Sequence, residues 1–215
     1  MQDEHTGRVL ANQLHLENRW GSPCRAFNLH ISLGDPVLRA LSRIQETILA
    51  VEPSLLRVPW QAMHISAAWL LPVHLGLPVA EKEGLWREHG HGWLADIATG
   101  LRELRSFRLC YTDVVATDSA IIALAWPTDQ VSELRSKLDK RLRLGRAVSA
   151  GDMVHTTLFR YAKPLGSPAS LFAAMASLEV NIEVQATEFL VVRERVFPSL
   201  KRDVLDRFLL DVDTP

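Results

Sequence analysis

The chain has 215 residues, of which 47% are hydrophobic and 23% are charged, a balance typical of a folded protein that buries a core. This length and composition exclude a multidomain machine and a mainly disordered chain. The formal net charge of −1 excludes a broad positive field that would hold long duplex DNA, so local groups must meet any phosphate-bearing ligand.

A strand, a helix and a second strand are predicted in the N-terminal half. Phe27 to Leu33 favours a strand, and the following Asp35-Pro36 is typical of a helix cap and first turn. The helix has one apolar face, formed by Val37, Leu41, Ile44, Ile48 and Val51. It should end near Glu52-Pro53, because the residue before a proline is pushed out of the helical region. Met63 to Leu71 then predicts a largely buried strand.

The same order of elements returns further along the chain. Ser119 to Trp126 predicts a strand, and Pro127-Thr128-Asp129 supplies stop and cap signals for a helix. That helix has an apolar face formed by Val131, Leu134, Leu138 and Leu142. Met153 to Tyr161 predicts the strand after it. The two units lie about 90 residues apart, which indicates a duplicated unit rather than a short-period solenoid.

The remaining segments frame these two units. Residues 1–22 predict an arm or short helix laid on the domain. Residues 72–105 form an insertion-like stretch whose helical part has an apolar stripe of Leu85, Trp93, Ile97, Leu101 and Leu104. After the second unit, Ser167-Pro168 begins a helix, and Val184 to Val192 and Val204 to Leu210 predict two closing strands.

The second strand of each unit contains a histidine and a hydroxyl residue two positions apart. These are His64-Ile65-Ser66 in the first unit and His155-Thr156-Thr157 in the second. Residues two apart on a strand point to the same face, ~6.5 Å from each other along the chain. If the units pack about a pseudo-twofold axis, two imidazoles for proton transfer and two hydroxyls for phosphate oxygens share one cleft.

A third triplet, His30-Ile31-Ser32, shows how common this pattern is. Roughly one match among eight histidines is expected by chance, so a single triplet says little. His30 lies in the first strand of its unit and has no histidine counterpart in the second unit, which favours a structural or groove-lining role. The matching positions of His64 and His155 make that pair informative.

At these two motifs the chain resembles the 2H phosphoesterases, a family that includes the bacterial 2′,3′-cyclic phosphodiesterases once named 2′-5′ RNA ligases. Met63-His64-Ile65-Ser66 is similar to the first family motif, and Val154-His155-Thr156-Thr157 is similar to the second. Arg160, three residues after the second hydroxyl, also matches many members. Ser66 stands where threonine is commoner, and Thr156 stands where a larger apolar residue is usual.

The resemblance covers the chain from about Phe27 to Leu210 and implies its fold. That fold is α+β and bilobal, with duplicated β-α-β units and mainly antiparallel sheets flanking a central cleft. The expected organisation is an arm at residues 1–22 and a single bilobal domain at 23–215, with the first repeat at 27–71, the insertion at 72–105, the second repeat at 119–161 and closing elements at 167–211.

The function that the resemblance implies agrees with the chemistry of the residues. We expect a metal-independent phosphodiesterase that opens a 2′,3′-cyclic phosphate or related linkage on a nucleotide or an RNA end, without a cofactor. His64 and His155 would be the catalytic acid and base, in either order, because histidine titrates near operating pH. Ser66, Thr157 and Arg160 would bind the phosphate. Arg160 has the alternative of pairing with a surface carboxylate.

Other functions remain open at this point. The same cleft could hydrolyse a cyclic di- or oligonucleotide or trim RNA 3′ ends, and a roof formed by residues 72–105 would favour small ligands. The histidines and hydroxyls could also hold a nucleotide without turning it over, or the four side chains could be purely structural. The base preference and the oligomeric state are not predicted.

Three further features of the sequence indicate ordinary surface structure or the cellular location. His74, His89 and His91 could bind zinc, but their glycine-rich spacing favours a solvated loop. The charge run Lys137 to Arg146 favours the outer face of a helix. Two cysteines, a polar N-terminus and the lack of an apolar run of ~18 residues predict a cytoplasmic protein that does not enter a membrane.

Overall fold

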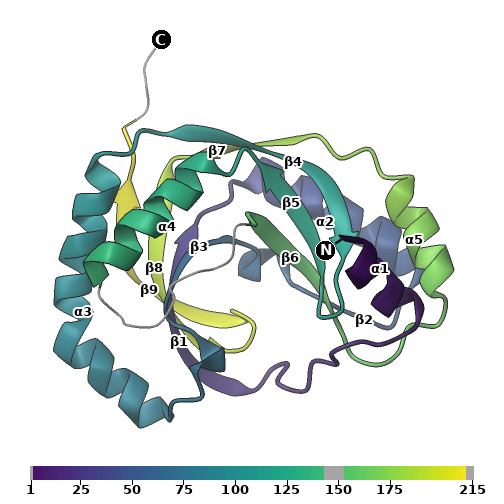
Figure 1. Ribbon diagram of the computed structural model, residues 1–215, viewed down its shortest axis with the longest axis horizontal. Coiled ribbons are helices and arrows are strands. Elements are labelled where there is room, and N and C mark those ends of the chain that lie inside the picture. Colours follow the sequence, from purple (N-terminus) through teal and green to yellow (C-terminus); the bar gives the residue numbers. More distant parts are fainter. Residues whose placement is uncertain (1, 143–152, 212–215) are drawn as a thin grey trace.

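The computed structural model describes residues 2–142 and 153–211, and it has two antiparallel sheets with helices packed around them (Figure 1). The predicted α+β class is therefore confirmed. The first sheet has the order β3-β1-β8-β9, with β1 at Pro23–Ile31, β3 at Ile65–Leu71, β8 at Glu188–Val196 and β9 at Lys201–Leu209. The second has the order β2-β6-β5-β4-β7, with β2 at Leu55–Arg57, β4 at Phe107–Ala116, β5 at Ile121–Trp126, β6 at His155–Tyr161 and β7 at Ile182–Ala186.

The described helices are α1 (Gln2–Leu10), α2 (Asp35–Val51), α3 (Val79–Arg102), α4 (Asp129–Leu142) and α5 (Pro168–Ala176), with two 3₁₀ turns, η1 (Trp60–Ala62) and η2 (Val73–Leu75). The two long apolar faces read from the sequence are the buried faces of α2 and α4, except that Val51 at the end of α2 is exposed. α3 runs along one side of the molecule and α5 along the opposite side (Figure 1). The charge run is partly on α4, where Lys137 pairs with Glu103 and Glu133, and its residues 143–146 lie outside the described residues.

Each strand–helix–strand unit gives its strands to one sheet and its helix to the other. β1 and β3 are neighbours in the first sheet, whereas α2 between them contacts β6 and β7 of the second. β5 and β6 are neighbours in the second sheet, whereas α4 between them contacts β3 of the first. A single cluster of buried apolar side chains runs through both halves. Neither half therefore has a core of its own, and the two sheets hold one another in place.

The closing segment differs from the prediction. Instead of one strand over residues 184–192, β7 and β8 are separated at Thr187, because β7 pairs with β4 in the second sheet and β8 pairs with β1 and β9 in the first. The chain crosses between the sheets at this point, although its apolar pattern continues. β9 begins at Lys201, earlier than predicted, because it pairs with β8 along its whole length.

Three smaller differences concern local pairing and capping. β4 and the short β2 were not predicted, since their identity comes from long-range partners, β5 and β7 for β4 and β6 for β2. The helix predicted to be capped by Asp35 has Gly34 at its N-cap, with Asp35 already in the first turn. The predicted start of α5 is correct, since the Ser167 side chain accepts a hydrogen bond from the Ser170 amide.

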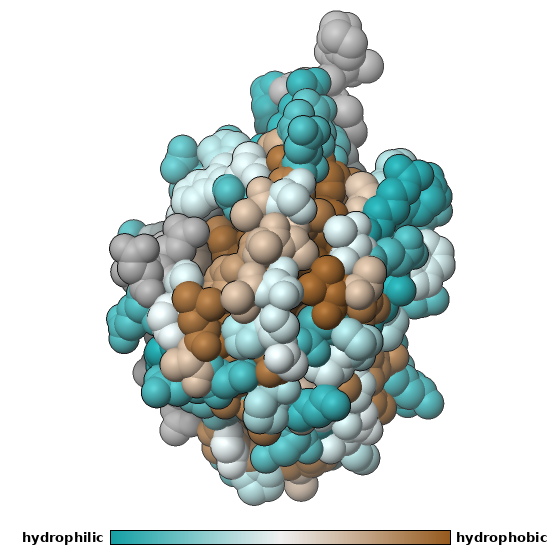
Figure 2. All heavy atoms as spheres, turned by 90° about the vertical axis from the view of Figure 1, so that its right-hand side faces the viewer, coloured by the Kyte–Doolittle hydropathy of each residue, from teal (hydrophilic) through white to brown (hydrophobic). Residues whose placement is uncertain are grey.

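A cavity lies beside β4, β5 and α5. It has a volume of about 550 Å³ and is lined mainly by apolar side chains of β4, β5 and the α5 region, among them Leu124, Trp126, Phe172 and Met175. Figure 2 shows this side of the molecule, where several apolar side chains lie exposed among polar ones. No helix among residues 2–142 and 153–211 combines the length and the hydropathy needed to cross a bilayer.

Candidate active site

All five residues predicted to form a site line one cavity of about 300 Å³ between the two sheets. Ser66 lies on β3 and His64 immediately before this strand, whereas His155, Thr157 and Arg160 lie on β6. The volume lies at the small end of the range for ligand sites, about 300 to 1,000 Å³. The structure therefore brings together the four side chains of the two motifs and the arginine that follows them.

Strand alternation explains why both motifs face the cavity. In β3, Ile65 and Ala67 are buried, whereas Ser66 between them is partly exposed. In β6, Thr156 and Leu158 are buried, whereas His155 and Thr157 are partly exposed. Since successive side chains of a strand point to opposite faces, each histidine and its hydroxyl partner share the cavity face.

Two buried polar side chains tie the motif strands to each other. The Thr156 hydroxyl donates a hydrogen bond of 3.0 Å to the backbone carbonyl of His64, and it also contacts the Tyr111 hydroxyl at 2.5 Å. Thr156 thus uses the hydroxyl that a larger apolar residue would lack.

The second of these side chains is Arg135 of α4, which is almost completely buried. Its guanidinium donates to the carbonyls of Ser66 at 2.8 Å, Ala67 at 3.0 Å and Met153 at 3.2 Å. One side chain therefore fixes the backbone of β3 relative to the approach to β6. This role was not predicted, because nothing in the helical pattern of the sequence marks Arg135 as buried.

The hydrogen bond of His64 fixes its tautomer. Its Nδ1 lies 2.7 Å from the Ala62 carbonyl, so Nδ1 carries the proton and Nε2 of the neutral ring is left as an acceptor. Burial, followed by the positive charge of Arg202, lowers the pKa of His64 to about 3, although the Ala62 contact opposes the shift. His64 is therefore neutral at pH 7 in the free protein.

His155 is held less tightly. Burial, followed by the charges of Arg135 and Arg160, lowers the pKa of His155 to about 4, and the backbone of Met153 partly opposes this. The Nδ1 atom of His155 is buried and, among residues 2–142 and 153–211, lacks a hydrogen bond of ordinary geometry. Its ring is therefore neutral at pH 7 and less fixed in tautomer than that of His64.

His30, the histidine without a counterpart, is fully buried behind His64. The two imidazoles stack with their centroids 3.5 Å apart and their planes 10° from parallel. Nδ1 of His30 lies 3.5 Å from a guanidinium nitrogen of Arg202, so Nδ1 accepts and His30 is neutral. Burial, then the nearby charges of His64 and Arg202, hold the pKa of His30 well below its usual value. His30 lies outside the cavity that holds the motif pair and supports the ring of His64.

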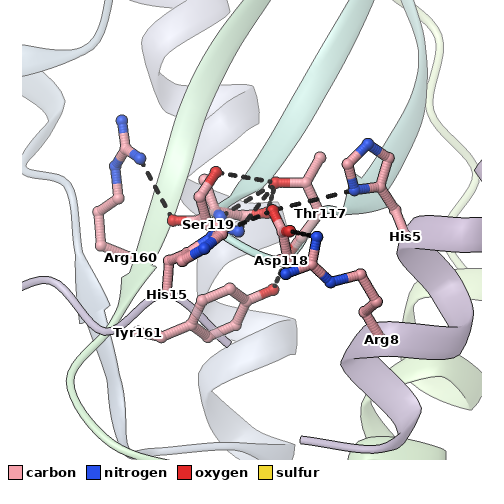
Figure 3. A network of polar contacts seen from close by, with 9 residues as sticks. His5, Arg8, His15, Thr117, Asp118, Ser119, Arg160 and Tyr161 are labelled. Carbon is pink, nitrogen blue, oxygen red and sulfur yellow. Dashed lines mark hydrogen bonds and ion pairs between the residues drawn. The ribbon is translucent and has the colours of Figure 1, made fainter. Parts of the chain in front are cut away.

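Arg160 is braced by the N-terminal arm. Its guanidinium donates to the Ser119 carbonyl at 3.2 Å, in the turn between β4 and β5. Asp118 of that turn accepts from Arg8 of α1 at 2.7 Å, and the amide of His15 donates to the Asp118 carbonyl at 2.7 Å (Figure 3). The charge of Glu17, also on the arm, acts on Arg160 and favours its charged form. The arm thus contributes to the site.

Several lining residues were not predicted. Arg19 of the arm reaches the cavity, with its guanidinium carbon 4.7 Å from the centre of the Phe197 ring. Polar lining comes from Asn28 of β1, Glu194 of β8 and Ser199 of the β8–β9 turn. Trp69 and His74 add aromatic lining and contact each other edge to face, with centroids 5.1 Å apart. These residues come from the arm, β1, β3, η2, β8 and the β8–β9 turn, so no local pattern in the sequence could reveal that they share a cavity.

The residues present fit a metal ion poorly. Among the described residues, potential ligand atoms of His30, His64 and Glu194 lie within 4.8 Å of one another. The two imidazole planes are nearly parallel, so their in-plane lone pairs run side by side instead of converging on one point at about 2.0–2.1 Å. His74, His89 and His91, the other candidate set, form no such group in the described part of the chain.

Comparison with solved structures defines the class of fold. TT0787 of Thermus thermophilus superposes with a TM-score of 0.64 at 19% identity, over 88% of this chain and 100% of that one. Escherichia coli LigT in its apo form gives 0.58 at 14% identity, over 88% and 99%. A crystal structure described as a phosphoesterase gives 0.56 at 15%, over 88% and 99%.

These likenesses show that the chain shares the fold of these three proteins. LigT has also been crystallised with 3′-AMP and with phosphate. No protein-family model matches the chain, and no curated protein sequence matches it.

Proposed function

We propose that the chain is a metal-independent phosphodiesterase that hydrolyses a 2′,3′-cyclic phosphate, or a related linkage, at the end of a nucleotide or RNA. The observation that carries this proposal is that two imidazoles and two hydroxyls, supplied by two different sheets, line one small cavity together with Arg160. The 3′-AMP and phosphate complexes of LigT support it by analogy of fold. The cavity volume of about 300 Å³ favours a terminal nucleotide over an internal stretch of RNA.

The surroundings of the two histidines suggest their separate roles. His64 would be the general base, since its Nδ1 proton is engaged by Ala62 and its Nε2 lone pair is available. Arg202 and burial keep this ring neutral. His155 would be the general acid, protonated when an anionic phosphate enters beside it. Each proton transfer contributes typically ~10²- to 10⁴-fold in rate.

The reaction balances with these groups alone. His64 accepts a proton from water as the water oxygen bonds to phosphorus. The bond from phosphorus to one ribose oxygen breaks, and His155 gives that oxygen its proton, leaving a phosphomonoester and a ribose hydroxyl. The Ser66 and Thr157 hydroxyls and Arg160 would stabilise the charge that builds up on the non-bridging oxygens. The two histidines then return to their starting protonation by exchange with solvent.

The test is hydrolysis of 2′,3′-cyclic mononucleotides by His64→Gln and His155→Gln variants. Each should lower kcat/KM by ~10²-fold or more, with unfolding curves close to wild type, whereas His91→Gln on the exposed face of α3 should have wild-type activity. Activity should survive EDTA. Wild-type rates in either cleft variant would remove that histidine from the mechanism, and tight nucleotide binding without product would identify a binding module instead.

A further inference from the structure

Three polar side chains line the cavity beside the phosphate-binding groups and are almost completely buried. Asn28 and Glu194 each have 6% of their surface exposed, and Ser199 has 3%. They come from three places in the chain, β1, β8 and the turn that follows β8. Buried polar groups are normally satisfied by hydrogen bonds, so unused capacity in such a cluster calls for an explanation.

The cluster has unused capacity, mainly for accepting hydrogen bonds. The Asn28 amide donates to one oxygen of Glu194 at 2.9 Å, and the backbone amide of Ser199 donates to the other at 3.3 Å. Each carboxylate oxygen has two acceptor positions, so each keeps one after these contacts. In the part of the chain that the structure describes, the side-chain oxygens of Asn28 and Ser199 have no hydrogen-bond partner. A ligand with adjacent N–H donors would complement this arrangement.

The backbone at Ser199 and the charge of Arg202 hold the Glu194 carboxylate in place. Ser199 adopts φ 54°, a left-handed conformation that few residues other than glycine adopt, and its amide contact with Glu194 fixes this turn. Arg202 lies opposite Glu194 in the β8–β9 pairing and interacts with it electrostatically. The carboxylate therefore has a compensating charge. Nε2 of His30 lies 3.9 Å from the oxygen that Asn28 contacts, which is too long for a hydrogen bond, so the remaining acceptor position of each oxygen is left for a ligand. Strained backbone of this kind is concentrated at binding sites.

The remaining walls of this part of the cavity are flat and largely apolar. Trp69, His74 and Phe197 line it together with Pro72 and Pro198. Aromatic rings of this kind stack on nucleobases regardless of their sequence, so selectivity must come from the polar edge.

We propose that Glu194, with Asn28 and Ser199, reads the base of the bound nucleotide and selects guanine. This inference rests on the proposed function, which places the phosphate between His64 and His155. Guanine presents two neighbouring donors, N1–H and N2–H, that match the two oxygens of a carboxylate. Adenine and cytosine present a ring nitrogen acceptor beside their amino group, which the Glu194 carboxylate would repel. Uracil presents a single N–H between two carbonyls. Hydrogen bonds to a charged acceptor are the stronger kind, so the discrimination should be substantial.

The experiment measures binding of 3′-GMP, 3′-IMP, 3′-AMP and 3′-CMP by isothermal titration calorimetry, with sulfate as a probe of the phosphate site alone. Inosine keeps N1–H and lacks the N2 amino group. Wild-type protein should bind 3′-GMP about 10- to 100-fold more tightly than 3′-AMP, with 3′-IMP between them. Glu194→Gln should remove most of this preference and leave the affinity for sulfate unchanged. Glu183→Gln on the exposed face of β7 is the matched control.

A second variant keeps the inference testable if Glu194→Gln fails to fold. Ser199→Ala retains the carboxylate and should reduce the preference for 3′-GMP about threefold, without an effect on sulfate. Equal binding of all four nucleotides, with sulfate bound normally, would overturn the guanine assignment while leaving the proposed function in place. If the wild-type protein does not bind sulfate, this result would instead overturn the phosphate site itself. A preference for 3′-GMP that survives both variants would assign base selection to other residues.

Discussion

Binding of an oxyanion between His64 and His155 should be accompanied by the uptake of a proton. With pKa values of about 3 and about 4, both rings are neutral in the free protein at pH 7, and about one His155 ring in a thousand is protonated. A unit negative charge about 4 Å from the ring, at an effective dielectric constant near 20, stabilises the imidazolium by ~4 kcal/mol. That corresponds to ~3 pKa units and would bring His155 to a pKa near 7. A dianion acts more strongly, so we expect between half a proton and one proton taken up at pH 7.

Sulfate is the suitable probe, because it does not titrate between pH 5 and 8. Calorimetric titrations at pH 7 in buffers of different ionisation enthalpy give the number of protons taken up. Sulfate affinity should also rise as the pH falls from 8 to 6, by about tenfold in total for a bound-state pKa near 7 and by up to ~100-fold if the dianion raises that pKa above 8, since the protonated site is the one that binds. His155→Gln should abolish the uptake, and His91→Gln should leave it unchanged. Sulfate binding with no proton uptake by the wild-type protein would refute the assignment of His155 as the group that charges.

Three further predictions concern groups behind the cavity. Arg135→Met should lower the free energy of unfolding by at least about 3 kcal/mol, because it removes the hydrogen bonds to three backbone carbonyls. Urea denaturation of this variant measures the loss, with Lys140→Met, at an exposed position on the same helix, as the control. Arg202→Met removes a cation that lowers the pKa of His64, so the acid limb of kcat/KM against pH should move to higher pH, and an unmoved limb would contradict that role. The pKa of His30 in the folded protein lies far below its value in the unfolded chain, so the free energy of unfolding should fall as the pH drops below ~6.5 and the unfolded chain takes up a proton. In His30→Gln this acid-induced fall should be smaller by up to ~1.4 kcal/mol per pH unit between pH 6 and 5, as measured by urea denaturation.

Strand alternation made the two motifs predictable. Once Met63 to Leu71 and Met153 to Tyr161 are assigned as strands, the period of two places Ser66 beside His64 and Thr157 beside His155. The helices α2 and α4 were equally accessible, because their apolar residues recur with a period of 3.6. Both predictions use only the local periodicity of the sequence, so they do not depend on knowing which strands pair.

The parts that sequence analysis missed depend on pairing between distant segments. Asn28 and Glu194 are 166 residues apart and meet only because β1 pairs with β8. In the sequence Glu194 follows a run of apolar residues, a position typical of an exposed charge at the end of a strand, whereas in the structure its carboxylate is buried. The break at Thr187 is invisible for the same reason, since β7 and β8 have similar composition and only their partners differ.

The net charge of −1 is the sum of charges that the fold distributes unevenly. Arg19 and Arg160 line the cavity, and Arg135 and Arg202 act on its histidines from behind. These four arginines come from the arm, α4, β6 and β9, so no basic run in the sequence shows that they surround one site. Their combined field explains two properties at once, because the cations that lower the pKa of both histidines also attract an anion. An anion that enters cancels part of this field, and the imidazole nearest to it can then take up the proton that a general acid needs.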